Sequence, residues 1–285
     1  MTNILVTGAN GQLGLTIASL KEKYADYNFF FAKKSALNIA NAIQVENYIL
    51  KNNIEVIINC AAYTQVDKAE DESNLANEIN HLAVKNLAEV TKKYAVKLIH
   101  ISTDYVFDGN KKIPYSEEDA TNPQNSYGKS KLAGENALLN INPKNSIIIR
   151  TSWLYSEFGH NFVKTILKIS KQKKEIQVVN NQFGTPTNAK DLAEVILTII
   201  PKINTNNIQI YHYANQGTCS WFRFAQEIVT LSSNNCVVMP ILAKDFKVKA
   251  VRPNFSMLNT NKIQNTFGID IPNWQDSLKE CICEL

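Results

Sequence analysis

The sequence lacks any long hydrophobic run, and no apolar stretch approaches the roughly 20 residues that a membrane-spanning helix needs. Strand-like residues begin at Asn3, so we expect no secretory signal peptide. The five cysteines are an odd number without C-x-x-C spacing, which is typical of a reducing compartment. We therefore expect a soluble, cytoplasmic protein.

A strong excess of one charge is also missing. Lys and Arg number 30 and Asp and Glu number 26, so the formal net charge is +4. The lysines accompany many Asn and Ile residues, so we interpret them as compositional. A nucleic-acid partner, which needs a denser basic patch, is not expected. No metal site is expected either, because the cysteines and histidines lack ligand spacing. We assign no role to the four histidines and expect two late cysteines to be inert thiols; these residues are His81, His100, His160, His212, Cys281 and Cys283.

The first half of the chain alternates between short apolar strands and amphipathic helices. This alternation is typical of a parallel sheet that is covered on both faces. We predict an α/β protein with a doubly wound parallel (Rossmann) sheet, whose ligands bind at the carboxyl ends of the strands. The expected strands are 3–7, 28–32, 56–60, 97–102 and 146–152, and the expected helices are 12–23, 42–52, 74–94 and 126–139.

The alternation of strands and helices becomes less regular in the second half of the chain. The 285 residues are about twice the usual domain size. We expect a second, smaller α/β lobe that binds the substrate, with the active site in the cleft between the two units. Residues 1–152 plus about 189–214 are predicted to form the dinucleotide-binding domain, and about 153–188 plus 215–285 the substrate lobe. The later elements are expected at 161–173, 176–179, 189–200 and 208–213, followed by two or three helical segments.

A glycine-rich turn follows the first expected strand. Gly8, Gly11 and Gly14 have the spacing G-x-x-G-x-x-G at a strand-to-helix junction. Glycines there let the backbone approach a pyrophosphate, which then binds the amides at the start of the helix. The alternative is a plain tight turn that needs positive φ. We interpret the motif as a dinucleotide-binding turn.

The residues after the second strand bear on the choice of nicotinamide cofactor. NAD sites usually place Asp or Glu there to hold the ribose 2′-hydroxyl. Here the sequence reads Ala32-Lys33-Lys34-Ser35, with two cations suited to a 2′-phosphate and no carboxylate. We therefore favour NADPH. NADH stays open, since both lysines could be solvated loop charges.

Tyr127 and Lys131 are four residues apart in an expected helix, so they share one face. A phenol has a pKa near 10, and bringing it to neutrality requires about 4 kcal/mol. One cation about 4 Å away supplies roughly that energy at an effective dielectric near 20. Thr103, at the end of the fourth strand, can hydrogen-bond the same reacting oxygen. A Y-x-x-x-K pair alone is more often a surface pair, but with the glycine turn and this hydroxyl we interpret the three residues as catalytic.

Several stretches together resemble the extended short-chain dehydrogenase/reductase superfamily and, within it, the dTDP-4-dehydrorhamnose reductase family. The resemblance spans nearly the whole chain. It implies reduction of the C4 keto group of a dTDP-linked 4-keto-6-deoxy sugar, with NADPH as cofactor. The stretches are TGANGQLG at the glycine turn, NCAAYTQVDKAE (59–70), STDYVFDG (102–109), YGKSKLAGE (127–135), RTSWLY (150–155), FGTPT (183–187) and the late Arg252-Pro253.

The resemblance also implies roles for single residues. Tyr127 is the proton donor, Lys131 lowers its pKa and binds the ribose, and Thr103 completes the set. Asp104 and Trp153 are expected to hold the sugar. The cofactor contacts, besides Tyr127 and Lys131, are expected from Gly8, Gly11, Gln12, Leu13, Asn38, Ile39, Ala61, Ala62 and Tyr63.

The sequence departs from the pattern of the family at two positions. Asn38 stands where the family more often has Asp, which weakens the expected adenine contact. Some members bind magnesium between subunits through acidic side chains, but Thr16 stands where one such Glu is expected, so no metal is carried over. A homodimer is left open.

Two further residues, Trp153 and Arg252, have two interpretations each, and we interpret Asp67 and Glu70 as structural. Trp153 could stack on a sugar or belong to the core. Arg252 could clamp a diphosphate or form a structural ion pair. Asp67 and Glu70 precede a long helix, and we expect them to stabilise its positive end.

Two other functions are compatible with parts of the pattern. A nucleotide-sugar dehydratase or epimerase shares the fold, but dehydratases carry an acidic pair after the Thr, whereas Asp104 and Tyr105 follow Thr103 here. A non-catalytic subunit that resembles the regulatory subunit of methionine adenosyltransferase is disfavoured by the intact catalytic set.

Overall fold

A six-stranded parallel sheet forms the centre of the larger part of the molecule in the computed structural model, which describes residues 1–285. The strand order is β10-β5-β4-β3-β1-β2, with every neighbouring pair parallel. This arrangement confirms the predicted doubly wound α/β fold. The strands are β1 (Thr2–Thr7), β2 (Tyr27–Ala32), β3 (Val56–Asn59), β4 (Lys97–Thr103), β5 (Ile147–Thr151) and β10 (Gln209–His212).

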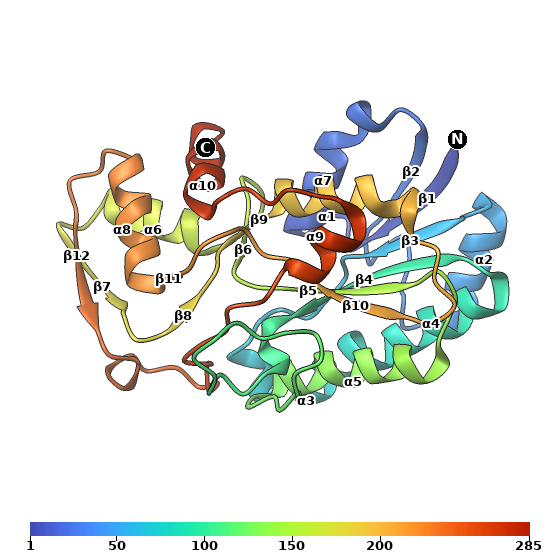
Figure 1. Cartoon of the computed structure of the whole chain (residues 1–285), viewed down its shortest axis with the longest axis horizontal. Coiled ribbons are helices and arrows are strands. Elements are labelled where there is room, and N and C mark those ends of the chain that lie inside the picture. Colours follow the sequence, from blue (N-terminus) through green and yellow to red (C-terminus); the bar gives the residue numbers. More distant parts are fainter.

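Helices cover both faces of this sheet (Figure 1). One face packs into a core of 23 buried residues with α1 (Gln12–Leu20), α7 (Ala189–Ile199) and α9 (Asn261–Phe267). The other face packs into a core of 18 buried residues with α2 (Ala42–Asn52) and α4 (Ala83–Tyr94), against which α5 (Ser126–Ile141) also lies. Both faces of the central sheet are therefore covered by helices, as the near-continuous apolar sequences of its strands require.

A smaller lobe lies beyond one end of the sheet (Figure 1). Its own core of 15 buried residues joins three helices, α6 (Phe162–Ser170), α8 (Trp221–Leu231) and α10 (Trp274–Cys283). A parallel strand pair, β7 (Glu175–Val179) and β12 (Val237–Ile241), packs against α6 and α8 at the outer edge of the lobe. Short pairs complete the lobe, namely β6 (Leu154–Tyr155) with β9 (Thr187–Asn188) and β8 (Phe183–Gly184) with β11 (Cys219–Ser220).

Two features of the smaller lobe were not expected from the sequence. The strand β12 lies where we expected only helical segments. Its exposed Val237 and Met239 and its Pro240 suit an edge strand, which tolerates a missing backbone donor. Helix α9 lies within the stretch that we assign to the substrate lobe, yet its Ile263 and Phe267 pack into the core of the larger unit. The assignment of residues to two domains remains a proposal.

The helix expected at 74–94 is interrupted. It consists of α3 (Ser73–Asn77), a π-helical segment from Glu78 to Leu82, and α4. Asn80 in that segment is fully buried, and its side-chain amide bonds both the N–H and the carbonyl of Tyr63. The π segment therefore places a polar side chain where a regular helix would present its apolar face. Short 3₁₀ turns occur at Lys21–Tyr24, Lys68–Glu70, Asp104–Val106, Ile200–Lys202 and Ala243–Asp245.

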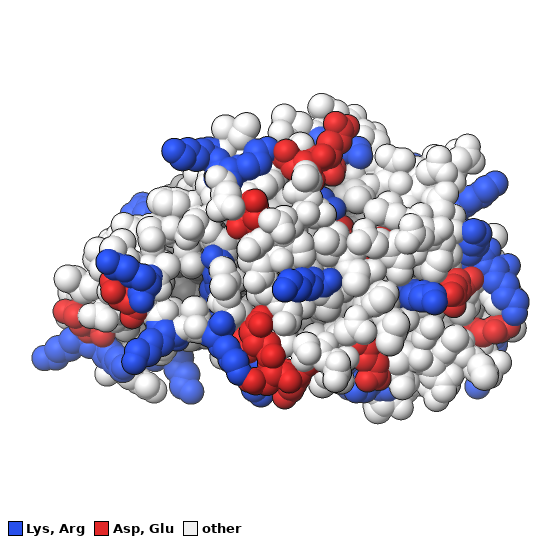
Figure 2. All heavy atoms as spheres, turned by 90° about the horizontal axis from the view of Figure 1, so that it is seen from below, with Lys and Arg blue, Asp and Glu red and all other residues white.

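The surface carries both signs of charge. On the face shown in Figure 2, positive side chains lie at both ends of the molecule, and acidic side chains lie among them and between the two ends. None of the helices has the length and apolar character to cross a membrane.

Candidate active site

Two adjoining cavities, of about 590 Å³ and 300 Å³, lie at the carboxyl ends of the central strands. They share the residues Asn10, Gly11, Cys60 and Ala62, so together they form one elongated cleft along the glycine turn. The larger cavity extends to the smaller lobe. Of the residues predicted for the site, it is lined by Gly11, Gln12, Leu13, Ala62, Thr103, Asp104, Tyr127, Lys131 and Trp153; the smaller cavity is lined by Gly8, Gly11, Asn38, Ile39, Ala61 and Ala62.

The glycine turn has the geometry that a dinucleotide requires. Gly8 has φ +63°, and a Cβ atom there would lie 2.6 Å from the backbone nitrogen of Ala61. A Cβ atom at Gly14 would lie 2.6 Å from the Gly8 carbonyl oxygen. Helix α1 begins without a side-chain cap at Gly11, so the amides of its first turn, including those of Gln12 and Leu13, are free for an anion. The residues present therefore fit a pyrophosphate.

The smaller cavity has an apolar wall and one basic side chain. Leu37, Asn38 and Ile39 line it, as does Lys34 from the segment after β2. Lys33 is exposed and lines neither cavity. Of the two lysines that we associated with a 2′-phosphate, Lys34 is thus the one at the cleft.

The side chains of two residues that were predicted to contact the cofactor make other contacts in the structure. The side-chain oxygen of Gln12 accepts hydrogen bonds from Asn161 (2.9 Å) and Ser156 (3.1 Å), which ties α1 to the smaller lobe. Tyr63 lines neither cavity. It is buried against Ala69 and Ala76, with Tyr127 packed beside it. Gln12 is therefore available to a dinucleotide through its backbone, and Tyr63 supports Tyr127 from behind.

The ionisation of Tyr127 depends mainly on its burial. Burial raises its pKa to about 12, the charge of Asp104 adds to this, and a hydrogen bond with Thr103 opposes it. Lys131 is not among these causes, so the lowering of the phenol pKa by the ammonium stays a prediction. A neutral phenol still carries the hydrogen that a proton donor needs at pH 7.

Lys131 lies under the cavity floor with only 1% of its surface exposed. Its Nζ donates to the Ile101 carbonyl over 2.6 Å and lies 3.3 Å from His100 Nε2. Burial lowers the pKa of Lys131 to about 8, although Glu135 and Cys60 act to raise it. Tyr127 and Lys131 therefore share a cavity wall, as their spacing predicts, while the amine has its contacts with β4.

Asp104 presents an unsatisfied oxygen. The residue is 2% exposed, and its Oδ1 accepts from the Thr103 hydroxyl over 3.0 Å. Its Oδ2 is buried without a hydrogen-bond partner in a side chain that lines the larger cavity. Burial raises the pKa of Asp104 to about 6. An unpaired buried oxygen is costly, so this carboxyl group is suited to a ligand hydroxyl.

An indole pair forms one wall of the larger cavity. Trp153 and Trp221 stack with ring centroids 3.6 Å apart and planes 12° from parallel. Trp153 has φ +48°, an unusual value for a bulky residue. A Cβ atom at Gly184 would lie 2.8 Å from the Trp153 ring, so the indole is held between that glycine and Trp221. Trp153 therefore packs beside the core of the smaller lobe and also lines the cavity.

The carboxylates of Asp67 and Glu70 make different contacts from those that we expected. Asp67 Oδ1 accepts from the backbone N–H groups of Lys249 (3.1 Å) and Ala250 (3.0 Å), and its Oδ2 pairs with Arg252 at 2.8 Å. Glu70 accepts from the backbone and hydroxyl of Ser126, at the start of α5. The expectation that they stabilise the helix after them is therefore wrong.

Arg252 forms the expected structural ion pair, and its role as a diphosphate clamp stays a prediction. It forms the ion pair with Asp67, and it also lines the larger cavity, with a buried Nε that has no hydrogen-bond partner. The sequence did not indicate Trp221, Asn161 or Phe162, which also line this cavity. They come from the smaller lobe. Ligand-binding residues of a parallel sheet can be predicted because they lie at the carboxyl ends of its strands, but the smaller lobe offers no such guide.

The whole chain matches known proteins. A family model described as RmlD substrate binding domain matches residues 1–285. A dTDP-4-dehydrorhamnose reductase from Aggregatibacter actinomycetemcomitans is 41% identical over 288 residues, covering 98% of each chain.

Solved structures match to the same extent. A dTDP-4-dehydrorhamnose reductase from Clostridium acetobutylicum has a TM-score of 0.93 and 41% identity, covering 99% of each chain. A dTDP-4-dehydrorhamnose reductase from Bacillus anthracis, determined in complex with NADP, has a TM-score of 0.93 and 37% identity, covering 100% of each chain.

Proposed function

The chain belongs to the family described as RmlD substrate binding domain, and from this premise we propose that it is a dTDP-4-dehydrorhamnose reductase. It reduces the C4 keto group of dTDP-4-dehydro-β-L-rhamnose with NADPH and forms dTDP-β-L-rhamnose. The observation that carries the proposal is that Thr103, Tyr127 and Lys131 line one cavity that continues along the glycine turn. A cytoplasmic location is part of the same proposal.

Different residues of the chain bind the cofactor and transfer the proton. NADPH supplies the hydride when bound. The amides at the start of α1 bind its pyrophosphate, and Lys34 meets its 2′-phosphate. Tyr127, neutral at pH 7 because burial raises its pKa to about 12, donates its hydrogen to the oxygen of the reduced carbonyl. Thr103, in hydrogen-bond contact with Tyr127, orients that phenol.

Residues of the larger cavity hold the sugar nucleotide. The unpartnered Asp104 Oδ2 accepts a sugar hydroxyl. The stacked pair of Trp153 and Trp221 supplies an apolar wall beside the ring. Arg252, with its free Nε in the same cavity, binds the diphosphate, because a guanidinium makes strong charge-assisted hydrogen bonds to phosphate oxygens.

The function is tested by following NADPH absorbance with purified protein and dTDP-4-dehydro-β-L-rhamnose. We expect one NADPH to be consumed per dTDP-β-L-rhamnose formed. The UDP-linked 4-keto sugar and NADH serve as comparison substrates in the same assay. Conversion of a nucleotide sugar with no net NADPH consumption would instead favour a dehydratase or epimerase, and failure to oxidise NADPH with any of these sugars would contradict the proposal.

Replacing Arg252 with Ala should raise KM for the nucleotide sugar and leave the cofactor affinity unchanged. A charge-assisted hydrogen bond contributes about 1.5–3 kcal/mol, which corresponds to a rise in KM on the order of 10–100-fold. Initial-rate kinetics with each substrate varied in turn provide the measurement. Arg223→Ala is the matched control, because that guanidinium pairs with Glu227 on the exposed side of α8. An unchanged KM in Arg252→Ala would remove the residue from the diphosphate site.

A further inference from the structure

Behind the cavity wall, a row of buried polar side chains leads to Lys131. It begins at Thr7 on β1, passes through Asn59 on β3 and His100 on β4, and ends at Lys131 on α5. Each of the four is at most 1% exposed. The row is continuous, because neighbouring polar atoms lie 2.6 Å, 3.0 Å and 3.3 Å apart along it. The protonation of each member is therefore constrained by the next.

The orientation of the Asn59 amide is fixed at one end of the row. Its Oδ1 accepts the Thr7 hydroxyl hydrogen over 2.6 Å and the Ala61 N–H over 3.3 Å. A flipped amide would set its NH₂ group against the Ala61 N–H, so that two donors would face each other. The Nδ2 of Asn59 therefore points at His100 Nδ1, 3.0 Å away, and donates to it.

This donor decides which ring nitrogen of His100 carries the proton. Burial and the neighbouring Lys131 charge lower the pKa of His100 well below its usual 6.5, so the ring is neutral and has a single proton. Because Nδ1 accepts from Asn59, that proton is on Nε2. The resulting N–H faces the Lys131 Nζ at 3.3 Å.

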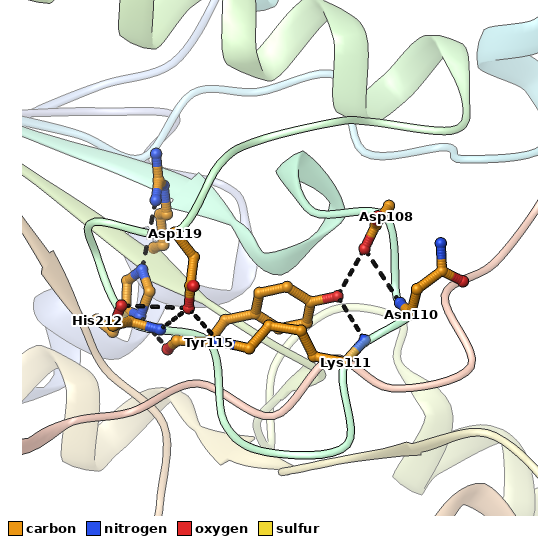
Figure 3. A network of polar contacts seen from close by, with 8 residues as sticks. Asp108, Asn110, Lys111, Tyr115, Asp119 and His212 are labelled. Atoms are coloured by element: carbon orange, nitrogen blue, oxygen red, sulfur yellow. Dashed lines mark hydrogen bonds and ion pairs between the residues drawn. The ribbon is translucent and has the colours of Figure 1, made fainter.

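The second buried histidine of the larger unit has the opposite arrangement (Figure 3). His212 Nδ1 lies 3.0 Å from the carbonyl oxygen of Tyr115, which can only accept, so Nδ1 carries the proton. Its Nε2 then offers a lone pair to Arg150 Nη1 at 3.4 Å. One buried imidazole thus presents an acceptor to a cation, whereas His100 presents a donor to Lys131.

We propose that Asn59 locks His100 in the Nε2–H form, so that His100 is a positioning residue that favours the neutral amine of Lys131 and makes its ammonium a stronger proton donor within the cavity. This inference rests on the proposed function for the role of Tyr127. An N–H group facing an ammonium is repulsive, whereas the lone pair of an amine accepts that hydrogen. The Lys131 amine can still donate to the Ile101 carbonyl.

The other groups that face Lys131 act in the opposite sense. Cys60 follows β3, and Glu135 lies one turn further along α5, where Arg150 pairs with it. Both raise the pKa of Lys131, whereas burial lowers it to about 8. The His100 N–H acts in the same direction as burial.

The proton steps balance. After Tyr127 has given its hydrogen to the product oxygen, a water molecule in the cavity gives the phenolate a proton and the O–H bond of Tyr127 forms again. An N–H bond of the Lys131 ammonium then breaks and returns a proton to that water. The amine that remains accepts the hydrogen of the His100 N–H. Lys131 then regains a proton from water in the cavity.

The direct test is the tautomer of each ring in the native protein, read from ¹⁵N spectra of histidine-labelled protein at pH 7. We expect His100 to show a protonated Nε2 and a bare Nδ1, and His212 to show the reverse as an internal standard. Signals are assigned by their loss in His100→Gln and His212→Gln. A protonated Nδ1 at His100 would overturn the proposal, and since no substrate is involved, this result does not depend on the reductase activity.

A second measurement uses the near-isosteric variant Asn59→Asp. Its carboxylate accepts where the amide donated, so the ring proton moves to Nδ1 and Nε2 becomes an acceptor for the Lys131 ammonium. We expect the NMR titration midpoint of the Lys131 side chain to rise by about 1 pH unit. Asn80→Asp is the control for added charge, because that buried residue does not touch His100. A rise in Asn59→Asp no larger than in this control, or an unchanged His100 tautomer, would overturn the proposal.

Discussion

Replacing Tyr127 with Phe should lower kcat by roughly 10²–10⁴-fold, the usual contribution of a general acid. The ring and its packing against Tyr63 and Tyr105 would stay, so only the donated hydrogen is lost. We therefore expect the affinity for NADPH to be retained. Turnover is measured by NADPH oxidation, and binding by fluorescence titration with the same preparation.

Tyr63→Phe is the matched control for this experiment. It removes a phenol hydroxyl that bonds Glu72 over 2.6 Å, from a side chain in the same small cluster as Tyr127. Because that hydroxyl points away from both cavities, kcat should stay close to the native value. If Tyr127→Phe kept native turnover, or if both variants lost it equally, Tyr127 would not be the proton donor.

Replacing Glu135 with Ala should destabilise the protein by about 3–5 kcal/mol, which is the usual cost of leaving a buried charge without its partner. Glu135 is fully buried, and it accepts from Arg150 Nη2 over 2.6 Å and from Arg150 Nε over 3.0 Å. The Ser102 hydroxyl also donates to it. The unfolding temperature should fall by on the order of 10 °C, as measured by thermal unfolding monitored by circular dichroism.

An exposed ion pair provides the comparison. Glu89 pairs with Lys85 on α4, and both side chains are 51% exposed. Glu89→Ala should leave the unfolding temperature almost unchanged, because water screens such pairs and solvates the remaining partner. A decrease in Glu135→Ala no larger than in Glu89→Ala would mean that Arg150 finds other partners, such as His212 and the Phe107 ring.

The larger unit could be predicted from the sequence because its strands are buried on both faces. Runs such as 56–58 in β3 are apolar throughout, and the strands are separated by amphipathic helices, so both period and order are visible. The smaller lobe does not offer that signal. Strand β12 has five residues, of which only Val238 is buried, and it contains Pro240, a pattern that does not separate it from a loop.

The candidate site could be predicted where a residue's position in the chain fixes its place in the fold. The glycines, Thr103 and Tyr127 come at strand ends or at helix starts, which meet at one edge of a parallel sheet. Asn161 and Trp221 reach the site from the smaller lobe, through the contacts of that lobe with the larger unit. Those contacts depend on how the lobe packs, so no local pattern indicates them.

The course of the chain limits how the protein can be divided. Strand β10 and helix α7 return to the larger unit after the chain has already built part of the smaller one, and α9 returns again near the C-terminus. A fragment that ends at residue 152 would leave the buried strand β5 as an unpaired edge. A fragment that ends anywhere between residues 152 and 260 therefore lacks part of both cores, and a circularly permuted or co-expressed arrangement is needed to obtain either unit alone.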